Sequence, residues 1–163
     1  MRNIDGDGKK LCSIQADLFE KSVTNLEMSS EVFARRFMNS NVVLELDNNS
    51  FLSDSKTVED IFTDLDNQYG KTSYGSVKYN QEAMYWAGYL YRYFAYTYEL
   101  SSKQVYKLLP LKEVIRMYLP YHTMDVSMAI ERLLEAKNIS FNENEIIKSN
   151  LTIMKHIRYS NNR

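Results

Sequence analysis

The residues best suited to catalytic chemistry lie around the second of the two prolines, Pro120. In the segment 120–125 (PYHTMD), the His122 imidazole could act as a general base, and the Asp125 carboxylate could orient it. The neighbouring sequence offers no nucleophile and no donors for an oxyanion. A histidine that bonds a helix end is therefore the favoured interpretation, with Asp125 suited to a helix N-terminus. An enzyme built around Tyr121, His122 and Asp125 is kept as an alternative.

Metal binding and disulfide chemistry have little support. The segment 3–8 (NIDGDG) imitates the start of a calcium loop, but such a loop needs glutamate at its twelfth position, where this chain has Ile14. The chain has one cysteine, Cys12, and two histidines, His122 and His156, that are distant in sequence. We therefore expect no metal, no cofactor and no intrachain disulfide. Cys12 has no flanking base and is expected in the core.

Four cations that could contact phosphates follow a tyrosine-rich stretch. The segments 100–109 and 111–116 have the outline of a helix-turn-helix, a motif whose second helix reads DNA. The residues that would contact DNA are Lys103, Lys107, Lys112 and Arg116. Because the turn holds Pro110 and the second segment is short and apolar, two helices packed in a bundle are favoured. A DNA-binding regulator is kept as an alternative.

Tyrosine is concentrated in one part of the chain. Seven of the 13 tyrosines lie between Tyr79 and Tyr98. Tyrosine buries a large area at low entropic cost and keeps a hydroxyl for hydrogen bonds, so it serves both cores and binding surfaces. We expect most of these rings to pack internally and some to reach a partner. The candidate partner-binding residues, which include two from the segment 120–125, are Tyr85, Tyr89, Arg92, Tyr93, Tyr96, Tyr121 and His122.

Arg92 lies inside this aromatic run. Its guanidinium could stack on rings and pair with Glu82, Glu99 or a carboxylate elsewhere. An ion pair within the fold is the favoured role. If Arg92 faced a partner instead, it would be the strongest candidate for a binding hot spot.

Composition favours one folded helical domain. The chain has 163 residues, 44% of them hydrophobic and 25% charged, which suits one domain with a sizeable core. Only two prolines and five glycines interrupt it, whereas all-β folds use these residues freely in turns. The sequence has no apolar run long enough for a membrane span and no signal-peptide core, so we expect a cytoplasmic protein and no membrane partner. The formal net charge of -1 gives no overall attraction to nucleic acid.

Hydrophobic periodicity predicts an all-α bundle that forms a single domain over 1–163. The longest helix, at about 80–99, is apolar or aromatic on nearly every side, so the other helices are expected to pack around it. Residues 1–9 are expected to be a loose end, and 70–78 a connector between helices. The segment 42–46 fits either a strand or a helical turn. Further helices are predicted at 10–26, 30–39, 57–69, 100–109, 111–118, 124–137 with Thr123 as its cap, and 142–159.

Three segments together resemble a known family. They are 30–40 (SEVFARRFMNS), 82–93 (EAMYWAGYLYRY) and 118–125 (YLPYHTMD). They are similar to small bacterial antitoxin-like proteins encoded beside toxins of the ADP-ribosyltransferase type. The resemblance covers roughly residues 30–135, and its middle motif is the most specific. It implies an antitoxin that is not an enzyme and that neutralises a cognate toxin by direct contact, and it carries over no binding residues.

Overall fold

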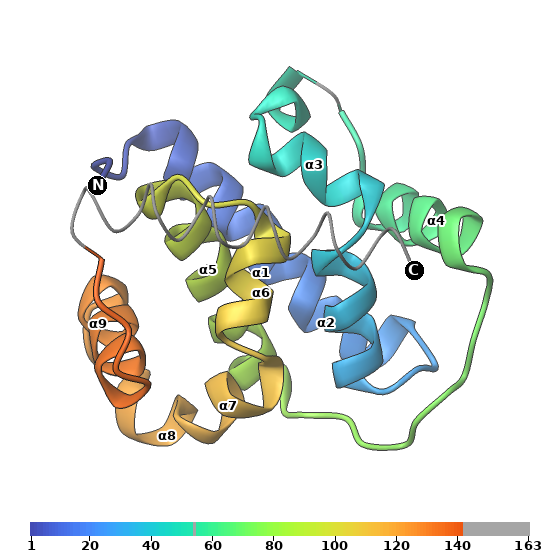
Figure 1. Cartoon of the computed structure of the whole chain (residues 1–163). Helices are drawn as coiled ribbons and strands as arrows, with labels where there is room; N and C mark the ends of the chain where they lie inside the picture. Colours follow the sequence, from blue (N-terminus) through green and yellow to red (C-terminus); the bar gives the residue numbers. More distant parts are fainter. Residues whose placement is uncertain (54, 142–163) are drawn as a thin grey trace, which may run out of the picture.

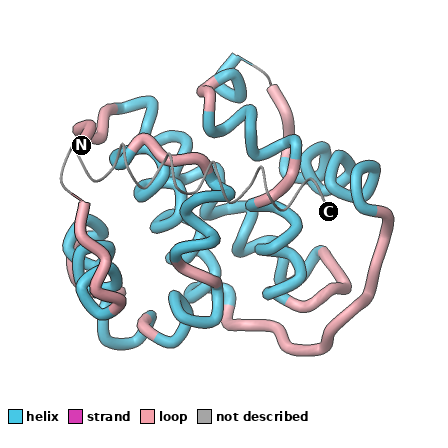
Figure 2. The backbone as a smooth tube through the Cα atoms, in the orientation of Figure 1, coloured by secondary structure: helices cyan, strands magenta, loops and turns pink. Residues whose placement is uncertain are grey.

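The computed structural model describes residues 1–53 and 55–141, and every regular element in these ranges is helical (Figure 2). The all-α prediction is confirmed. The predicted helix at 142–159 and His156 lie outside the described residues. In chain order the elements are α1 (Gly6–Asn25), α2 (Ser30–Met38), α3 (Asn41–Asp47), the 3-10 helix η1 (Ser50–Ser53), α4 (Val58–Tyr69), α5 (Gln81–Tyr98), α6 (Ser102–Leu108), α7 (Leu111–Arg116), α8 (Tyr118–Tyr121) and α9 (Val126–Ala136).

None of the helices within the described ranges is both long and apolar enough to cross a membrane.

Helix α5 is the centre of the bundle, as its composition predicted. It contacts α1 along much of its length and also touches α6, α7, α8 and α9 (Figure 1). Where α5 faces α1, a Cβ added to Gly88 would lie 2.8 Å from both the Gln15 carbonyl oxygen and the Phe19 ring. Only glycine lets the two helices approach this closely, since any side chain would meet the backbone of α1.

The N-terminal end is not loose, contrary to the expectation for residues 1–9. Helix α1 already begins at Gly6, because the Asp5 carboxylate accepts a hydrogen bond from the Gly8 N–H at 2.8 Å. The Arg2 N–H donates to the Thr97 carbonyl at 2.7 Å. The bond from Arg2 reaches across to α5, a contact that local polarity and glycine content did not reveal.

Side-chain caps explain where most helices begin. Thr57 caps α4 and Ser101 caps α6, each within a reciprocal capping box. The segment 42–46, for which strand and helix were both open, is part of α3 behind the cap Ser40. The cap of α9 is Asp125 and not Thr123, so this helix begins two residues later than predicted.

The connector between α4 and α5 has no regular structure but is fixed along α2. It runs from α4 round the edge of the molecule to α5 (Figure 1). The N–H groups of Ser29 and Ser30 donate to the carbonyls of Tyr74 and Val77 at 3.0 and 3.1 Å. Between these bonds Gly75 has a φ of 83°, and a Cβ there would lie 2.5 Å from the Ser29 Oγ. The turn therefore requires glycine for both its conformation and its space.

Candidate partner-binding surface

Three tyrosines form a stripe on one side of α5. Tyr85, Tyr89 and Tyr93 are spaced by four residues, which places them above one another on a helix. Tyr85 is 37% exposed, and Tyr89 and Tyr93 are half-buried. The Tyr89 and Tyr93 rings stack with their centroids 6.5 Å apart. This stripe is the part of the tyrosine-rich helix that other helices leave partly uncovered.

The start of α9 lies beside this stripe. Ser127 and Asp125 both act on the pKa of the Tyr93 phenol, and the Asp125 charge also acts on that of Tyr89. Tyr121 and His122 immediately precede this start, Tyr121 half-buried and His122 exposed. We use the term aromatic surface for the five predicted residues that remain accessible: Tyr85, Tyr89, Tyr93, Tyr121 and His122.

The short helix α8 carries Tyr121 of the aromatic surface and packs against α5. The Tyr118 ring contacts Trp86 of α5 edge-on at 5.7 Å between centroids, and it packs on the His122 ring at 4.5 Å. Leu119, the next residue of α8, is 78% exposed. The Trp86 indole N–H is buried and has no acceptor within the described part of the chain. Helix α8 therefore adds an exposed leucine close in sequence to Tyr121, and its Tyr118 ring packs on a tryptophan whose donor is unpaired among the described residues.

Two tyrosines of this surface have raised pKa values. Burial raises the pKa of the Tyr89 and Tyr93 phenols, and the nearby Asp125 carboxylate raises the pKa of Tyr93 further. The pKa of Asp125 is lowered by hydrogen bonds from the Ser127 hydroxyl and backbone N–H. At neutral pH Tyr89 and Tyr93 thus present phenol hydroxyl groups next to the Asp125 carboxylate.

Two of the predicted partner-binding residues lie elsewhere, and the expectation that they reach a partner is wrong. Arg92 is only 1% exposed, and its Nη1 lies 2.7 Å from the Asp47 Oδ1. Tyr96 is 6% exposed and donates its hydroxyl to the Asp5 carboxylate at 2.7 Å. Both sit on faces of α5 that neighbouring segments cover. The favoured ion pair of Arg92 exists, but with Asp47 and not with Glu82 or Glu99.

The structure does not join His122 and Asp125 into a catalytic pair. The His122 Nδ1 lies 2.9 Å from the Tyr118 carbonyl oxygen, so this nitrogen bonds the backbone of α8. The Asp125 carboxylate accepts from Ser127 and caps α9. Burial raises the pKa of the Cys12 thiol to about 12, which suppresses the reactive thiolate.

The four cations of the helix-turn-helix prediction are all exposed. Lys103 and Lys107 lie on α6, and Lys112 and Arg116 on α7. Pro110 is the N-cap of α7, which is only six residues long and buries Leu111 and Val114. These positions could contact phosphates, although little of α7 is left to read base edges.

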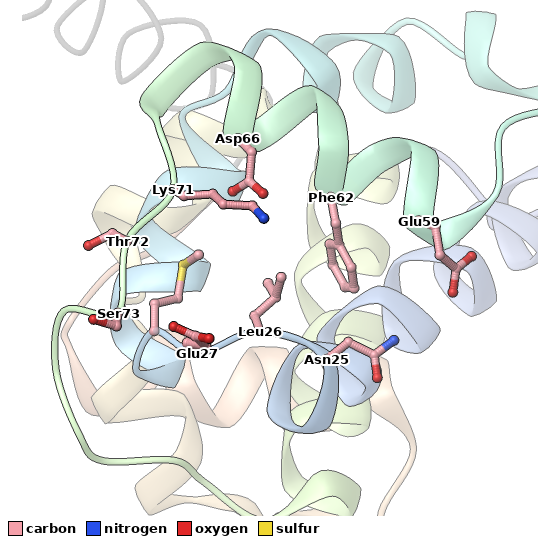
Figure 3. Close-up of a pocket in the computed structure, with 10 residues that line it drawn as sticks. Asn25, Leu26, Glu27, Glu59, Phe62, Asp66, Lys71, Thr72 and Ser73 are labelled. Atoms are coloured by element: carbon pink, nitrogen blue, oxygen red, sulfur yellow. The ribbon is translucent and has the colours of Figure 1, made fainter.

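A pocket that the sequence did not reveal lies on another part of the molecule. It has a volume of about 520 Å³ and lies where the end of α1, helix α4 and the start of the connector meet (Figure 3). Its lining comes from three separate stretches of sequence, 25–28, 59–66 and 71–73. No periodicity or motif links these stretches, so sequence analysis had no signal for the pocket.

No metal centre is found among the residues that the structure describes, since no three or more His, Cys, Asp and Glu side chains there are grouped closely enough to hold an ion.

Comparisons with models of protein families, with curated proteins and with solved structures found no match. The resemblance to antitoxin-like proteins therefore rests on the three sequence segments that carry it.

Proposed function

We propose that this protein is an antitoxin that binds a cognate toxin, of the ADP-ribosyltransferase type, through the aromatic surface. The observation that carries the proposal is the stripe of Tyr85, Tyr89 and Tyr93, which the other helices leave partly uncovered. Binding would be steric, with the surface covering the catalytic cleft of the toxin or its substrate site. A stable contact of this kind buries about 1,200–2,000 Å² in total and draws most of its energy from a few aromatic anchors.

The chemistry of the stripe suits this role. Neutral phenols offer both a donor and an acceptor, and their rings have only two side-chain torsions to fix on binding. The stacked Tyr89 and Tyr93 rings are already ordered against each other, so less entropy is lost when a partner packs on them. The Asp125 charge beside them would favour a partner patch that carries donors or cations.

The test is coexpression with the product of the neighbouring gene. If that product is a toxin, growth should be rescued and the two proteins should copurify. The Tyr89→Ala/Tyr93→Ala variant should lose both effects. Tyr74→Ala is the matched control, because Tyr74 is 72% exposed but lies on the connector. Circular dichroism should show that both variants keep their helices. Full rescue and copurification by Tyr89→Ala/Tyr93→Ala would show that the aromatic surface is not the binding site.

DNA binding is a second candidate function, favoured by one observation. The cations Lys103, Lys107, Lys112 and Arg116 are all exposed, and each of two consecutive helices carries a pair of them four residues apart. If they contact phosphates, affinity for the protein's own promoter should fall steeply with salt. Replacing Lys103 and Lys107 with glutamine should flatten this dependence. Absent or salt-insensitive binding would exclude this function.

A further inference from the structure

The pocket between α1, α4 and the connector has an apolar floor. Leu26 and Met28, from the α1–α2 turn, and Phe62 of α4 line it. Met28 and Phe62 are buried, and Leu26 is half-buried. Figure 3 shows the Leu26 and Phe62 side chains in the middle of the opening. At about 520 Å³ the pocket has the volume of a small-molecule site.

Carboxylates surround this floor. Glu27, Glu59 and Asp66 line the pocket, and Lys71 is the one cation among its lining residues that the structure describes. No ion pair or side-chain hydrogen bond is found for any of the three carboxylates within residues 1–53 and 55–141. Several unpaired carboxylates around a pocket create a negative electrostatic potential inside it, so the pocket attracts cations.

The arrangement does not suit a metal ion. Figure 3 shows Glu27, Glu59 and Asp66 on different sides of the opening, with Leu26 and Phe62 between them. Among the described residues, no cluster of three or more His, Cys, Asp and Glu side chains is close enough together to hold a metal ion. Separated charges with apolar surface between them instead match a cation whose own charges are separated by methylene groups.

The walls of the pocket are fixed before any ligand binds. The Arg36 guanidinium donates to the Gly70 carbonyl at 2.7 Å, which anchors the connector where it leaves α4. The Lys78 ammonium donates to the carbonyls of Val23, at 2.8 Å, and Leu26, which ties the end of α1 to the far part of the connector. A ligand therefore loses little affinity to ordering of the protein.

From this geometry we infer that the pocket binds a linear aliphatic polyamine. Its methylene groups lie on Leu26 and Phe62, and its ammonium groups lie near Glu27, Glu59 and Asp66. An ammonium group close to the Phe62 ring also gains from the ring's negative face. The site is distant in sequence from the aromatic surface, and the inference does not depend on toxin binding.

The test is calorimetric titration of the full chain with spermidine at low salt. Each of Glu59→Gln and Asp66→Asn should weaken binding by about twofold to fivefold, since each removes one partly exposed charge. Lys71→Gln should strengthen binding by a similar factor, because the Lys71 ammonium points into the opening and repels the ligand (Figure 3). Glu131→Gln is the matched control, an exposed carboxylate on α9 outside the pocket, and should leave binding unchanged.

Competition between Mg²⁺ and spermidine distinguishes a specific binding site from nonspecific attraction of counterions. Mg²⁺ carries charge without methylene groups, so at equal concentration of charge it should displace little spermidine. The inference is overturned if spermidine does not bind, if Mg²⁺ at equal concentration of charge abolishes the calorimetric signal of spermidine binding, or if Glu59→Gln and Asp66→Asn bind like Glu131→Gln. Opposite effects of Asp66→Asn and Lys71→Gln would support the inference.

Discussion

Replacing Asp47 with alanine should lower the free energy of unfolding by about 3 kcal/mol, because Arg92 would be left as an unpaired charge in the core. The Arg92 Nη1 lies 2.7 Å from the Asp47 Oδ1, and the Arg92 Nε donates to the Gln15 Oε1 at 2.8 Å. Asp47 also accepts from the Ser102 N–H at 3.0 Å and from its hydroxyl at 2.6 Å. Removing one partner of a buried pair costs about 3–5 kcal/mol. The Asp47 side chain is 13% exposed, so water screens part of the loss and the lower end applies.

Urea unfolding followed by Trp86 fluorescence would measure this effect, since Trp86 is the only tryptophan in the chain. A lower midpoint at unchanged slope reports a loss of stability without a change in the surface exposed on unfolding. Glu45→Ala is the control. It removes a carboxylate 3.0 Å from the Lys56 ammonium, but both side chains are about 30% exposed, so the cost should stay below about 1 kcal/mol.

A double variant tests whether the cost comes from the unpaired charge. Arg92→Met/Asp47→Ala removes both charges and should be more stable than the sum of the two single variants predicts. The reasoning is refuted if Asp47→Ala costs no more than Glu45→Ala. It is also refuted if the two single changes prove additive, since Arg92 and Asp47 would then not be coupled.

Three further predictions follow from other contacts. Gly88→Ala should destabilise the protein by about 1–3 kcal/mol, because the new methyl group would meet Phe19 at 2.8 Å, and thermal unfolding would show it. Cys12 should react with a thiol reagent in urea but hardly at all in the folded protein, since burial raises its pKa to about 12; rapid reaction of the folded protein would contradict this. Folding lowers the pKa of Asp125, so the ionised carboxylate stabilises the folded protein. This contribution to the free energy of unfolding is fully present above the unfolded pKa of about 3.9 and is lost as pH falls through the folded pKa. The stability difference between the wild type and Asp125→Asn should therefore shrink from pH 7 to pH 3, and a constant difference would refute this.

The pocket and the ion pair between Arg92 and Asp47 show why part of the structure could not be predicted from the sequence. Asp47 and Arg92 are 45 residues apart, and the sequence analysis could name only Glu82, Glu99 or an unspecified carboxylate elsewhere as partners for the arginine. Glu27, Glu59 and Lys71 likewise line one pocket only because the end of α1, helix α4 and the start of the connector come together. Contacts of this kind depend on the relative placement of helices, and hydrophobic periodicity does not encode that placement.

Helix positions, in contrast, were largely determined by the sequence itself. Thr57 and Ser101 cap their helices through bonds to residues three positions away, so the signal and its effect are both local. The apolar surface of 80–99 was likewise enough to identify α5 as the central helix. Which side of α5 faces outward was decided by the tertiary structure alone, because a helix that is apolar all round has no face that periodicity can single out. Packing of α1 and α6 against α5 buries Arg92 and Tyr96 and leaves Tyr85 exposed, and this choice defines the surface proposed to bind a toxin.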